Sequence, residues 1–328
     1  MAKSSHAFLF TKIQMIRSLV LIYCALSASA NICTLRTQAQ IDVLPRRNIS
    51  SVSPVNVSTA LGPYSVKVGK IDHIPGLKFG APHTGFIFYP EAKNTTEKFP
   101  LLSFAHGVFV GSIYPPSTTC YATSLEIVAS YGFIVVGPNS CPAVNCLTEF
   151  AADQLATIKA CKENPSLHPA LASANFDIVG VFGHSMGGMA TLGSAGGLAG
   201  HNPAEYNIKA AVSQHPCWDM TQLPGGVSIP IMFTAGSADI VCEDGCAEID
   251  YAEVKTPKVL FNIEGAGHME PTNLGKNRED TAAALFFSCW LRGENCNEVY
   301  GSTGKRICSQ IQGGTLHECK VEGRKMSM

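Results

Sequence analysis

Short apolar runs recur along the chain from residue 101 onward, and glycine, proline or asparagine bounds each of them. The runs are roughly four to eight residues long and lack the strict alternation of a half-exposed strand, a pattern typical of strands covered on both faces. The expected strands span 101–107, 133–139, 177–183, 209–215, 229–236 and 258–265.

Longer segments with helical spacing or many small residues separate these runs. The repeated alternation of buried strand and helix predicts a mostly parallel, doubly wound α/β sheet, which binds ligands at the carboxyl ends of its strands. The Phe287/Trp290 pair has helical spacing, which favours a core position over substrate contact. The expected helices span 123–132, 147–164, 185–197 and 279–291.

The N-terminus differs from this alternating pattern. Three basic residues precede the apolar run 18–26, and small residues in an A-x-A arrangement follow it. This pattern predicts a secretory signal peptide over 1–30, starting at either Met1 or Met15, and therefore a secreted protein. Because the run is shorter than the roughly 18 residues that span a bilayer, no integral membrane segment is expected after its removal.

Composition places the rest of the chain among well-cored globular proteins, with 46% hydrophobic and 15% charged residues. We expect an extended lead over 31–61, a single α/β domain over 62–293 and a cysteine-containing tail over 294–328. A formal net charge of −1 gives no electrostatic footprint for nucleic acid. We expect a monomer.

Cysteine usage agrees with export. Twelve of the 13 cysteines lie beyond the signal, and neither a C-x-x-C pair nor an H-E-x-x-H helix occurs. Disulfides are therefore expected, and no metal site is predicted. Cys141/Cys146 and Cys308/Cys319 are candidate local pairs, although the spacing leaves the connectivity open. Three sequons, which would suit a glycoprotein, begin at Asn48, Asn56 and Asn94.

One serine motif stands where an apolar run meets a helix. Residues 183–187 have the sequence Gly-His-Ser-Met-Gly, which matches the form G-x-S-x-G. In a nucleophile elbow, glycines leave room for a sharp strand-to-helix turn that exposes the serine hydroxyl above the sheet. The motif is weak alone in a chain with 30 glycines, but a predicted strand precedes it and a predicted helix follows it.

A serine nucleophile needs a base, and the base needs an acid that fixes its tautomer. His268 follows the last predicted strand between glycines, and Asp239 follows the strand before it. The order Ser185, Asp239, His268 is that of α/β-hydrolases. An oxyanion hole needs two backbone N–H donors, for which Met186 and Val108 are the candidates. Alternative acids are the nearby carboxylates Glu243, Asp244 and Glu270.

The other histidines near these motifs are interpreted as structural. His106 and His184 each adjoin a motif glycine and are expected to point away from the nucleophile. His215 is interpreted as a strand-end residue and His201 as a surface residue.

Several segments resemble a known family when taken together: GPYSV, FIFYP, FAHG, GHSMGG, KAAVSQHPCWD, IPIMFTAGSAD and GAGHMEP. Over residues 62–293 the chain resembles polyester hydrolases and cutinase-like α/β-hydrolases. That group borders on dienelactone hydrolases, platelet-activating-factor acetylhydrolases and chlorophyllases.

The resemblance implies an α/β-hydrolase fold, no cofactor, and cleavage of carboxylic esters, as in a cutinase, lipase or polyesterase. It implies Ser185, Asp239 and His268 as the triad and Val108 and Met186 as the oxyanion hole. Substrate contacts would come from Trp218, which would wall the acyl cleft, and from Phe109.

Two departures bear on the substrate. Bacterial polyesterases often have an aromatic residue where this chain has Val108, with Phe109 next, and plant chlorophyllases have arginine where it has Met186. A chlorophyllase-like esterase and a platelet-activating-factor acetylhydrolase-like esterase therefore remain alternatives.

The predicted strands 209–215 and 229–236 are separated by about a dozen residues, too few for a lid domain. An open cleft for bulky esters is the expected result. Two further alternatives are an inactive hydrolase fold kept as a binding module, which usually loses a triad member, and a peptidase. Nothing in the chain builds a pocket for a charged peptide terminus.

Overall fold

The computed structural model describes most of the chain from residue 61 onward. The predicted signal peptide, the lead up to residue 60, and Asn48, Asn56, Cys141 and Cys146 lie outside the described residues. The described ranges are 61–78, 83–108, 117–140, 147–197, 202–216, 224–300, 306–309 and 316–323.

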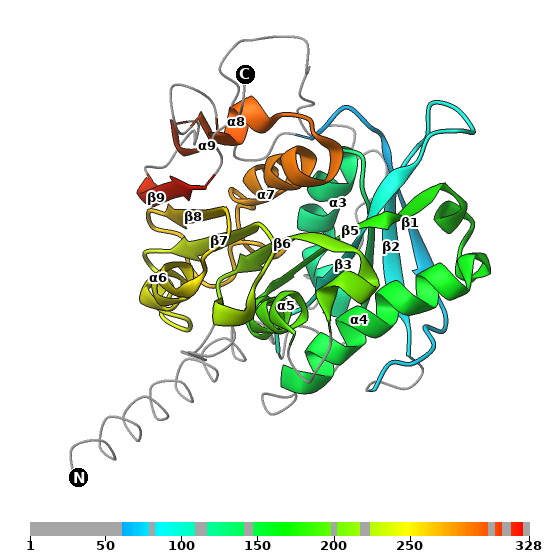
Figure 1. Ribbon diagram of the computed structural model, residues 1–328, viewed down its shortest axis with the longest axis horizontal. Helices are drawn as coiled ribbons and strands as arrows, with labels where there is room; N and C mark the ends of the chain where they lie inside the picture. Colours follow the sequence, from blue (N-terminus) through cyan, green and yellow to red (C-terminus); the bar gives the residue numbers. More distant parts are fainter. Residues whose placement is uncertain are drawn as a thin grey trace.

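A mixed sheet runs through the centre of the molecule (Figure 1), with strand order β1-β2-β4-β3-β5-β6-β7-β8-β9 within the described residues. The strands from β4 across to β8 are parallel, whereas β1 and β2 at one side and β9 at the other pair antiparallel. The strands are β1 (Val66–Ile71), β2 (Gly85–Pro90), β3 (Phe99–Ala105), β4 (Ile134–Pro138), β5 (Ala174–His184), β6 (Ile208–Gln214), β7 (Ile231–Gly236), β8 (Lys258–Ile263) and β9 (Leu316–Glu322).

Helices cover both faces of this sheet. α3 and α7 pack on one face and α4, α5 and α6 on the other, as Figure 1 shows. The α-helices are α3 (Ala122–Ser130), α4 (Leu147–Glu163), α5 (Met186–Gly196), α6 (Asp244–Glu253), α7 (Asp280–Phe287), α8 (Cys296–Tyr300) and α9 (Arg306–Ser309). Shorter turns are η1 (Ser117–Tyr121), η2 (Pro165–Leu167), η3 (Pro169–Ser173), η5 (Pro203–Tyr206), η6 (Pro224–Gly226) and the π turn η7 (Ser288–Arg292).

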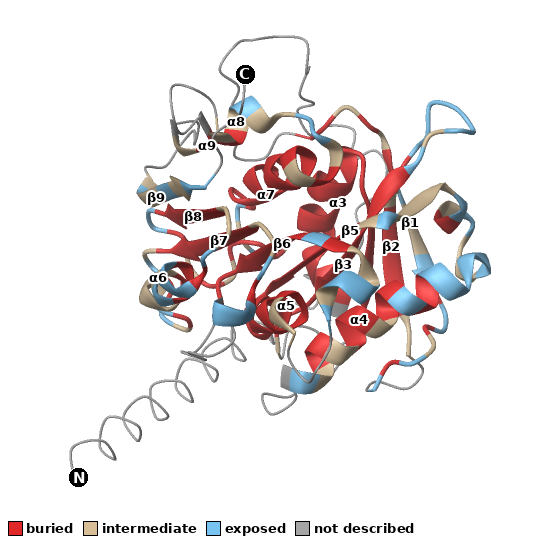
Figure 2. Ribbon diagram, viewed as in Figure 1, coloured by how far each residue is buried: buried red, intermediate tan, exposed pale blue. Residues whose placement is uncertain are grey.

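The two faces bury two separate apolar clusters (Figure 2), one under α3 and α7 and the other under α4, α5 and α6. Strands β3, β4, β7 and β8 are buried at every position, as their predominantly apolar runs predict. The doubly wound α/β-hydrolase fold is therefore confirmed. The connection from β6 to β7 spans only residues 215–230, which leaves no length for a lid domain.

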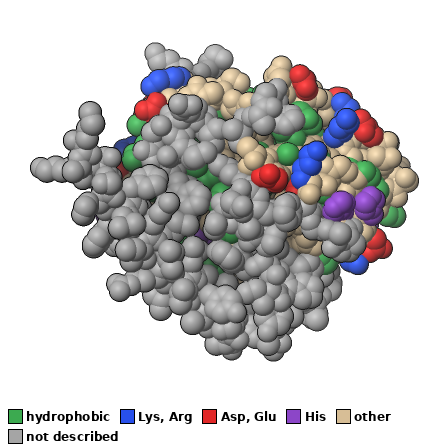
Figure 3. Space-filling model, turned by 90° about the horizontal axis from the view of Figure 1, so that it is seen from below, with side chains coloured by type: hydrophobic (Ala, Val, Ile, Leu, Met, Phe, Trp, Pro, Cys, Tyr) green, Lys and Arg blue, Asp and Glu red, His purple; other side chains and the backbone are tan. Residues whose placement is uncertain are grey.

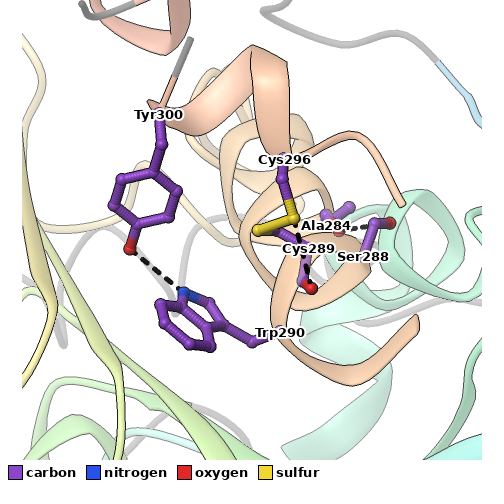
Figure 4. Close-up of a disulfide and its surroundings, with 6 residues drawn as sticks. All are labelled: Ala284, Ser288, Cys289, Trp290, Cys296 and Tyr300. Carbon is purple, nitrogen blue, oxygen red and sulfur yellow. Dashed lines mark hydrogen bonds between the residues drawn. A yellow bond between two sulfur atoms is a disulfide. The ribbon is translucent and has the colours of Figure 1, made fainter. Parts of the chain in front are cut away.

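The tail after residue 293 is tied to the fold in two places. Its strand β9 pairs antiparallel with β8, and the Cys308–Cys319 disulfide confirms the predicted local pair. A second disulfide, Cys289–Cys296, links the π turn to α8. Beside it Trp290 Nε1 donates to the hydroxyl of Tyr300 at 3.0 Å (Figure 4).

Phe287 is buried and Trp290 packs against the same cluster, so both occupy the core position that their spacing predicts. On the face seen in Figure 3, the described basic and acidic side chains are interspersed rather than gathered by sign. None of the described helices has the length and apolar character that a membrane crossing requires.

Candidate active site

Ser185 occupies a sharp turn between β5, which ends at His184, and α5, which begins at Met186. Its φ of 59° lies in the left-handed region, where a non-glycine residue is strained. The flanking glycines make the turn possible. A Cβ on Gly187 would overlap the Ala105 carbonyl at the end of β3, and one on Gly183 would overlap the Gly187 carbonyl. The sequence motif therefore forms the elbow geometry.

A continuous chain of hydrogen bonds leads away from the Ser185 hydroxyl. Ser185 Oγ lies 2.9 Å from His268 Nε2, and His268 Nδ1 lies 2.8 Å from Asp239 Oδ2. The three residues come from the loops after β5, β8 and β7, which lie together at the carboxyl edge of the sheet. Each of the three residues is buried, with 5 to 8% of its surface still exposed to solvent.

Asp239 is held as an acceptor on both oxygens. Its Oδ1 accepts the backbone N–H groups of Val241 and Cys242 at 2.9 and 2.8 Å. Burial alone would raise the pKa of Asp239, but the charges and hydrogen bonds of His268 and His215 outweigh burial and hold that pKa well below its ordinary value. Asp239 is therefore an ionised carboxylate beside the imidazole.

The alternative acids contact other partners. Glu270 forms a buried ion pair with Arg278, whose Nε lies 2.8 Å from its Oε1. Asp244 accepts from Asn262 Nδ2 at 3.0 Å, and Glu243 is exposed at the start of α6. Asp239 is thus the carboxylate that contacts His268 among these four.

Tyr121 and His184 connect three loops of the site. The Gly107 N–H donates to Tyr121 Oη, which lies 2.8 Å from His184 Nδ1, and His184 Nε2 lies 2.7 Å from the His268 carbonyl. Burial holds the pKa of His184 well below its ordinary value, so the ring is neutral, accepting from Tyr121 and donating to His268. The ring therefore holds in place the loop that carries His268.

His106 is also neutral, because burial lowers its pKa to about 4. Its Nε2 accepts the Ser140 N–H at 2.9 Å, and its Nδ1 lies 2.8 Å from the Gly107 carbonyl. The ring thereby supports the loop after β3.

The candidate oxyanion residues flank the serine. Met186 is the first residue of α5, and half-buried Val108 follows Gly107 at the end of β3. A Cβ on Gly107 would lie 3.2 Å from Ser185 Cβ, so this loop passes directly beside the nucleophile candidate. Phe109, Trp218 and His201 lie outside the described residues.

His215 is the residue that sequence reasoning left without a role in the site. It directly follows β6, its side chain is fully buried, and its Nδ1 lies 2.9 Å from the same Asp239 Oδ2 that His268 contacts. Its Nε2 lies 3.0 Å from Glu279 Oε2 at the start of α7. His215 lies within the family-like segment KAAVSQHPCWD, but that resemblance gave it no role, and a further signal is the acidic pair Glu279–Asp280 at the start of a mostly apolar helix.

One cluster in the described part of the chain has a metal-like composition. The ligand atoms of His215, Asp239 and His268 all lie within 4.8 Å of one another. Both imidazole Nδ1 atoms face one Asp239 oxygen, an arrangement that needs a proton on each nitrogen, whereas a metal needs the nitrogen lone pair. We assign these side chains as hydrogen-bonding partners and not as metal ligands.

A family model described as Chlorophyllase matches residues 56–220. The chain belongs to the chlorophyllase family. The match includes the elbow and ends before Asp239 and His268, so it covers the serine but not the acid or the base. Membership in this α/β-hydrolase family confirms the resemblance drawn from the sequence motifs.

A curated relative extends the similarity along the chain. The bis(hydroxyethyl) terephthalate hydrolase of Streptomyces coelicolor is 24% identical over 244 residues, covering 72% of this chain and 69% of that protein. Its name is that of an enzyme acting on a polyester-type ester, which agrees with the polyester hydrolase side of the predicted resemblance.

Replacing Asp239 by asparagine removes the charge that stabilises a protonated His268. We expect kcat for ester cleavage to fall by roughly 10³- to 10⁴-fold with little change in KM. Steady-state kinetics of Asp239→Asn beside Glu243→Gln, a matched change on an exposed carboxylate, measures the effect. Equal loss in both variants, or none in Asp239→Asn, would contradict the role of Asp239.

Proposed function

We propose that this protein is a secreted serine hydrolase that cleaves carboxylic esters through an acyl-enzyme on Ser185. The observation that carries the proposal is the unbroken hydrogen-bond chain from Ser185 through His268 to the ionised Asp239, at an elbow that holds the serine over the sheet edge. Chlorophyllase family membership and the ester-cleaving relative support the same chemistry.

In the first half-reaction, Ser185 Oγ attacks the ester carbonyl carbon while His268 Nε2 accepts the hydroxyl proton. Asp239 stabilises the imidazolium that forms, and the N–H groups of Met186 and Val108 bind the negative oxygen of the tetrahedral intermediate. The intermediate collapses, His268 returns the proton to the leaving alkoxide, and the alcohol departs.

In the second half-reaction, water attacks the acyl carbon of the ester to Ser185 and gives its proton to His268. Collapse of this second intermediate releases the carboxylic acid and returns the proton to Ser185 Oγ. These steps need no redox partner, and the protons balance within the Ser185–His268 pair and water.

The proposed substrates are esters with bulky acyl or alcohol groups. The β6–β7 connection of residues 215–230 is too short to fold a lid over the site. The substrate in the relative's name, bis(hydroxyethyl) terephthalate, and the chlorophyllase family name both point to bulky esters. Amides are not proposed, because nothing in the chain indicates a pocket for a peptide terminus.

Labelling of Ser185 tests the serine mechanism. A fluorophosphonate probe reacts only with an activated serine, so we expect labelling of the wild-type protein and its loss in Ser185→Ala. Peptide mass spectrometry locates the probe. An unlabelled but folded wild-type protein would favour a binding module instead.

A substrate panel tests the ester class. We expect cleavage of bis(hydroxyethyl) terephthalate, chlorophyll, short-chain triacylglycerols or acetyl phospholipids to require Ser185, with matched amides cleaved far more slowly. For a short-chain ester, the rate is expected to rise smoothly with concentration, because no lid has to open. A sharp jump at the solubility limit, or preference for amides, would count against this assignment.

Secretion is supported by the charge and hydropathy pattern of residues 1–30. Among the sequons, Asn94 stands exposed in the turn between β2 and β3, where a glycan could be added. We expect expression in a eukaryotic host to deliver the protein to the medium with Asn31 as its first residue. N-terminal sequencing checks this expectation, and retention of an intact N-terminus inside the cell would refute it.

A further inference from the structure

His215 is bonded at both ring nitrogens to carboxylates. Nδ1 lies 2.9 Å from Asp239 Oδ2 and Nε2 lies 3.0 Å from Glu279 Oε2, with every partner side chain fully buried. Ionised carboxylates only accept hydrogen bonds, and a neutral imidazole has a single N–H to give. Two carboxylate partners are therefore satisfied together only when His215 carries both protons and a positive charge.

The position of this ring is fixed from several directions. The backbone φ of His215 is 44°, in the left-handed region, and its N–H donates to the Thr234 carbonyl at 2.9 Å. The other oxygen of Glu279 accepts from Thr234 Oγ1 and Gln214 Nε2 at 2.9 and 3.0 Å. A strained backbone held by so many contacts is a feature that clusters at functional sites.

The surrounding charges favour a cation at His215. Burial alone would lower the pKa of His215, but Glu279 and Asp239 outweigh it and raise that pKa to about 10. Burial and the neighbouring Glu279 raise the pKa of Asp280 well above its usual range, so Asp280 is neutral. The titratable groups that face this network are Asp239, His268, Glu279, Asp280, His184, Glu270 and Arg278.

The remaining neighbours leave the balance at His215 unchanged. His184 is neutral, and its ring centroid lies 5.9 Å from that of His215. Glu270 and Arg278 neutralise each other as an ion pair. The charged unit beside His268 is therefore Asp239 with its cation His215, backed by Glu279.

The charge on His215 in this unit opposes a further positive charge on His268. The centroids of the His215 and His268 rings are 6.1 Å apart, and both rings donate to one oxygen of Asp239. A proton added to His268 therefore places a second positive charge on a carboxylate that His215 already partly neutralises.

We propose that His215 is a positioning residue that, with Glu279 behind it, anchors the Asp239 carboxylate and, as a buried cation whose ring centroid lies 6.1 Å from that of His268, opposes a further positive charge on His268. The proposal rests on the proposed function, since it concerns the base of that reaction. It predicts an esterase whose activity extends further into the acidic range because of a charge outside the three-residue triad.

The variant His215→Asn tests this charge. Asparagine tolerates a positive φ and can keep an amide donor on Asp239, so the change removes mainly the cation. Without the cation, protonation of His268 becomes easier and the active form is lost sooner as pH falls. We expect the acidic limb of the kcat/KM profile to move to higher pH by roughly one unit.

Two companion variants separate this effect from a loss of stability. His215→Asn with Glu279→Gln removes the carboxylate left without its cation, so its Tm should exceed that of the single variant while the limb stays shifted. Thr234→Val removes a hydrogen bond to Glu279 from an uncharged hydroxyl and changes no charge. Its Tm should therefore fall while the acidic limb stays at the wild-type position. Either of two results would overturn the proposal. The acidic limb of the kcat/KM profile of His215→Asn could coincide with the wild-type limb, or the position of the limb could follow Tm across the variants.

Nuclear magnetic resonance of protein labelled with ¹⁵N-histidine decides the charge state independently of turnover. We expect one imidazole to keep both nitrogens protonated at pH 8, with its signals absent from His215→Asn. A singly protonated His215 at that pH would overturn the proposal even in an active enzyme. An unlabelled Ser185 in the fluorophosphonate experiment would instead refute the proposed function, while the resonance measurement still reports on His215.

Discussion

The site depends on one close approach, between the end of β3 and the elbow that carries Ser185. The Ala105 carbonyl lies against Gly187 so tightly that a single added carbon atom would collide with it. Because the two backbones touch, the loop after β3 passes directly beside the serine. Hydrogen bonds through Gly107, Tyr121 and His184 then connect that loop to the loop that carries His268. The placement of Ser185 beside the loop after β3 therefore follows from a contact made of backbone alone.

Four buried histidines, His106, His184, His215 and His268, lie in or beside the site, and their hydrogen-bond partners differ. His106 and His184 accept a hydrogen bond at one nitrogen, which fixes them as neutral supports. His215 faces two carboxylates and is charged, whereas His268 faces one carboxylate and the hydroxyl of Ser185. Identical side chains within a few ångströms thus perform distinct tasks, because local acceptors rather than residue type set their charge.

Much of the fold could be predicted from the sequence where local pattern and burial agree. The six parallel strands and the helices α3, α4, α5 and α7 follow from apolar runs and helical spacing, because strands covered on both faces are mostly apolar. The outer strand β1 mixes exposed and buried positions, β9 is half-buried or exposed throughout, and β2 is a short run, so their strand character depends on pairing with a neighbour. Serine, acid and base could be named from motif order, and their convergence follows from strand order in the sheet.

His215 could not be assigned in the same way. Its partners Asp239 and Glu279 are 24 and 64 residues away along the chain, and nothing beside His215 in the sequence signals that they meet. His215 directly follows β6. This position indicates a role in the site only once the fold is known, because the sheet places β6 next to β7 and α7 packs on it. Residues that act through long-range pairing of charges are therefore the ones that motif analysis misses.

The tail strand β9 has a consequence for the whole molecule in solution. A bare β8 would present unpaired backbone groups along a fully buried, mostly apolar strand, which is a template for sheet growth between molecules. β9 occupies that border and presents Glu318, Lys320 and Glu322 instead, while Cys308–Cys319 fastens it in place. β9 thus covers the edge of β8 with charged side chains, which discourages the sheet of one molecule from pairing with that of another.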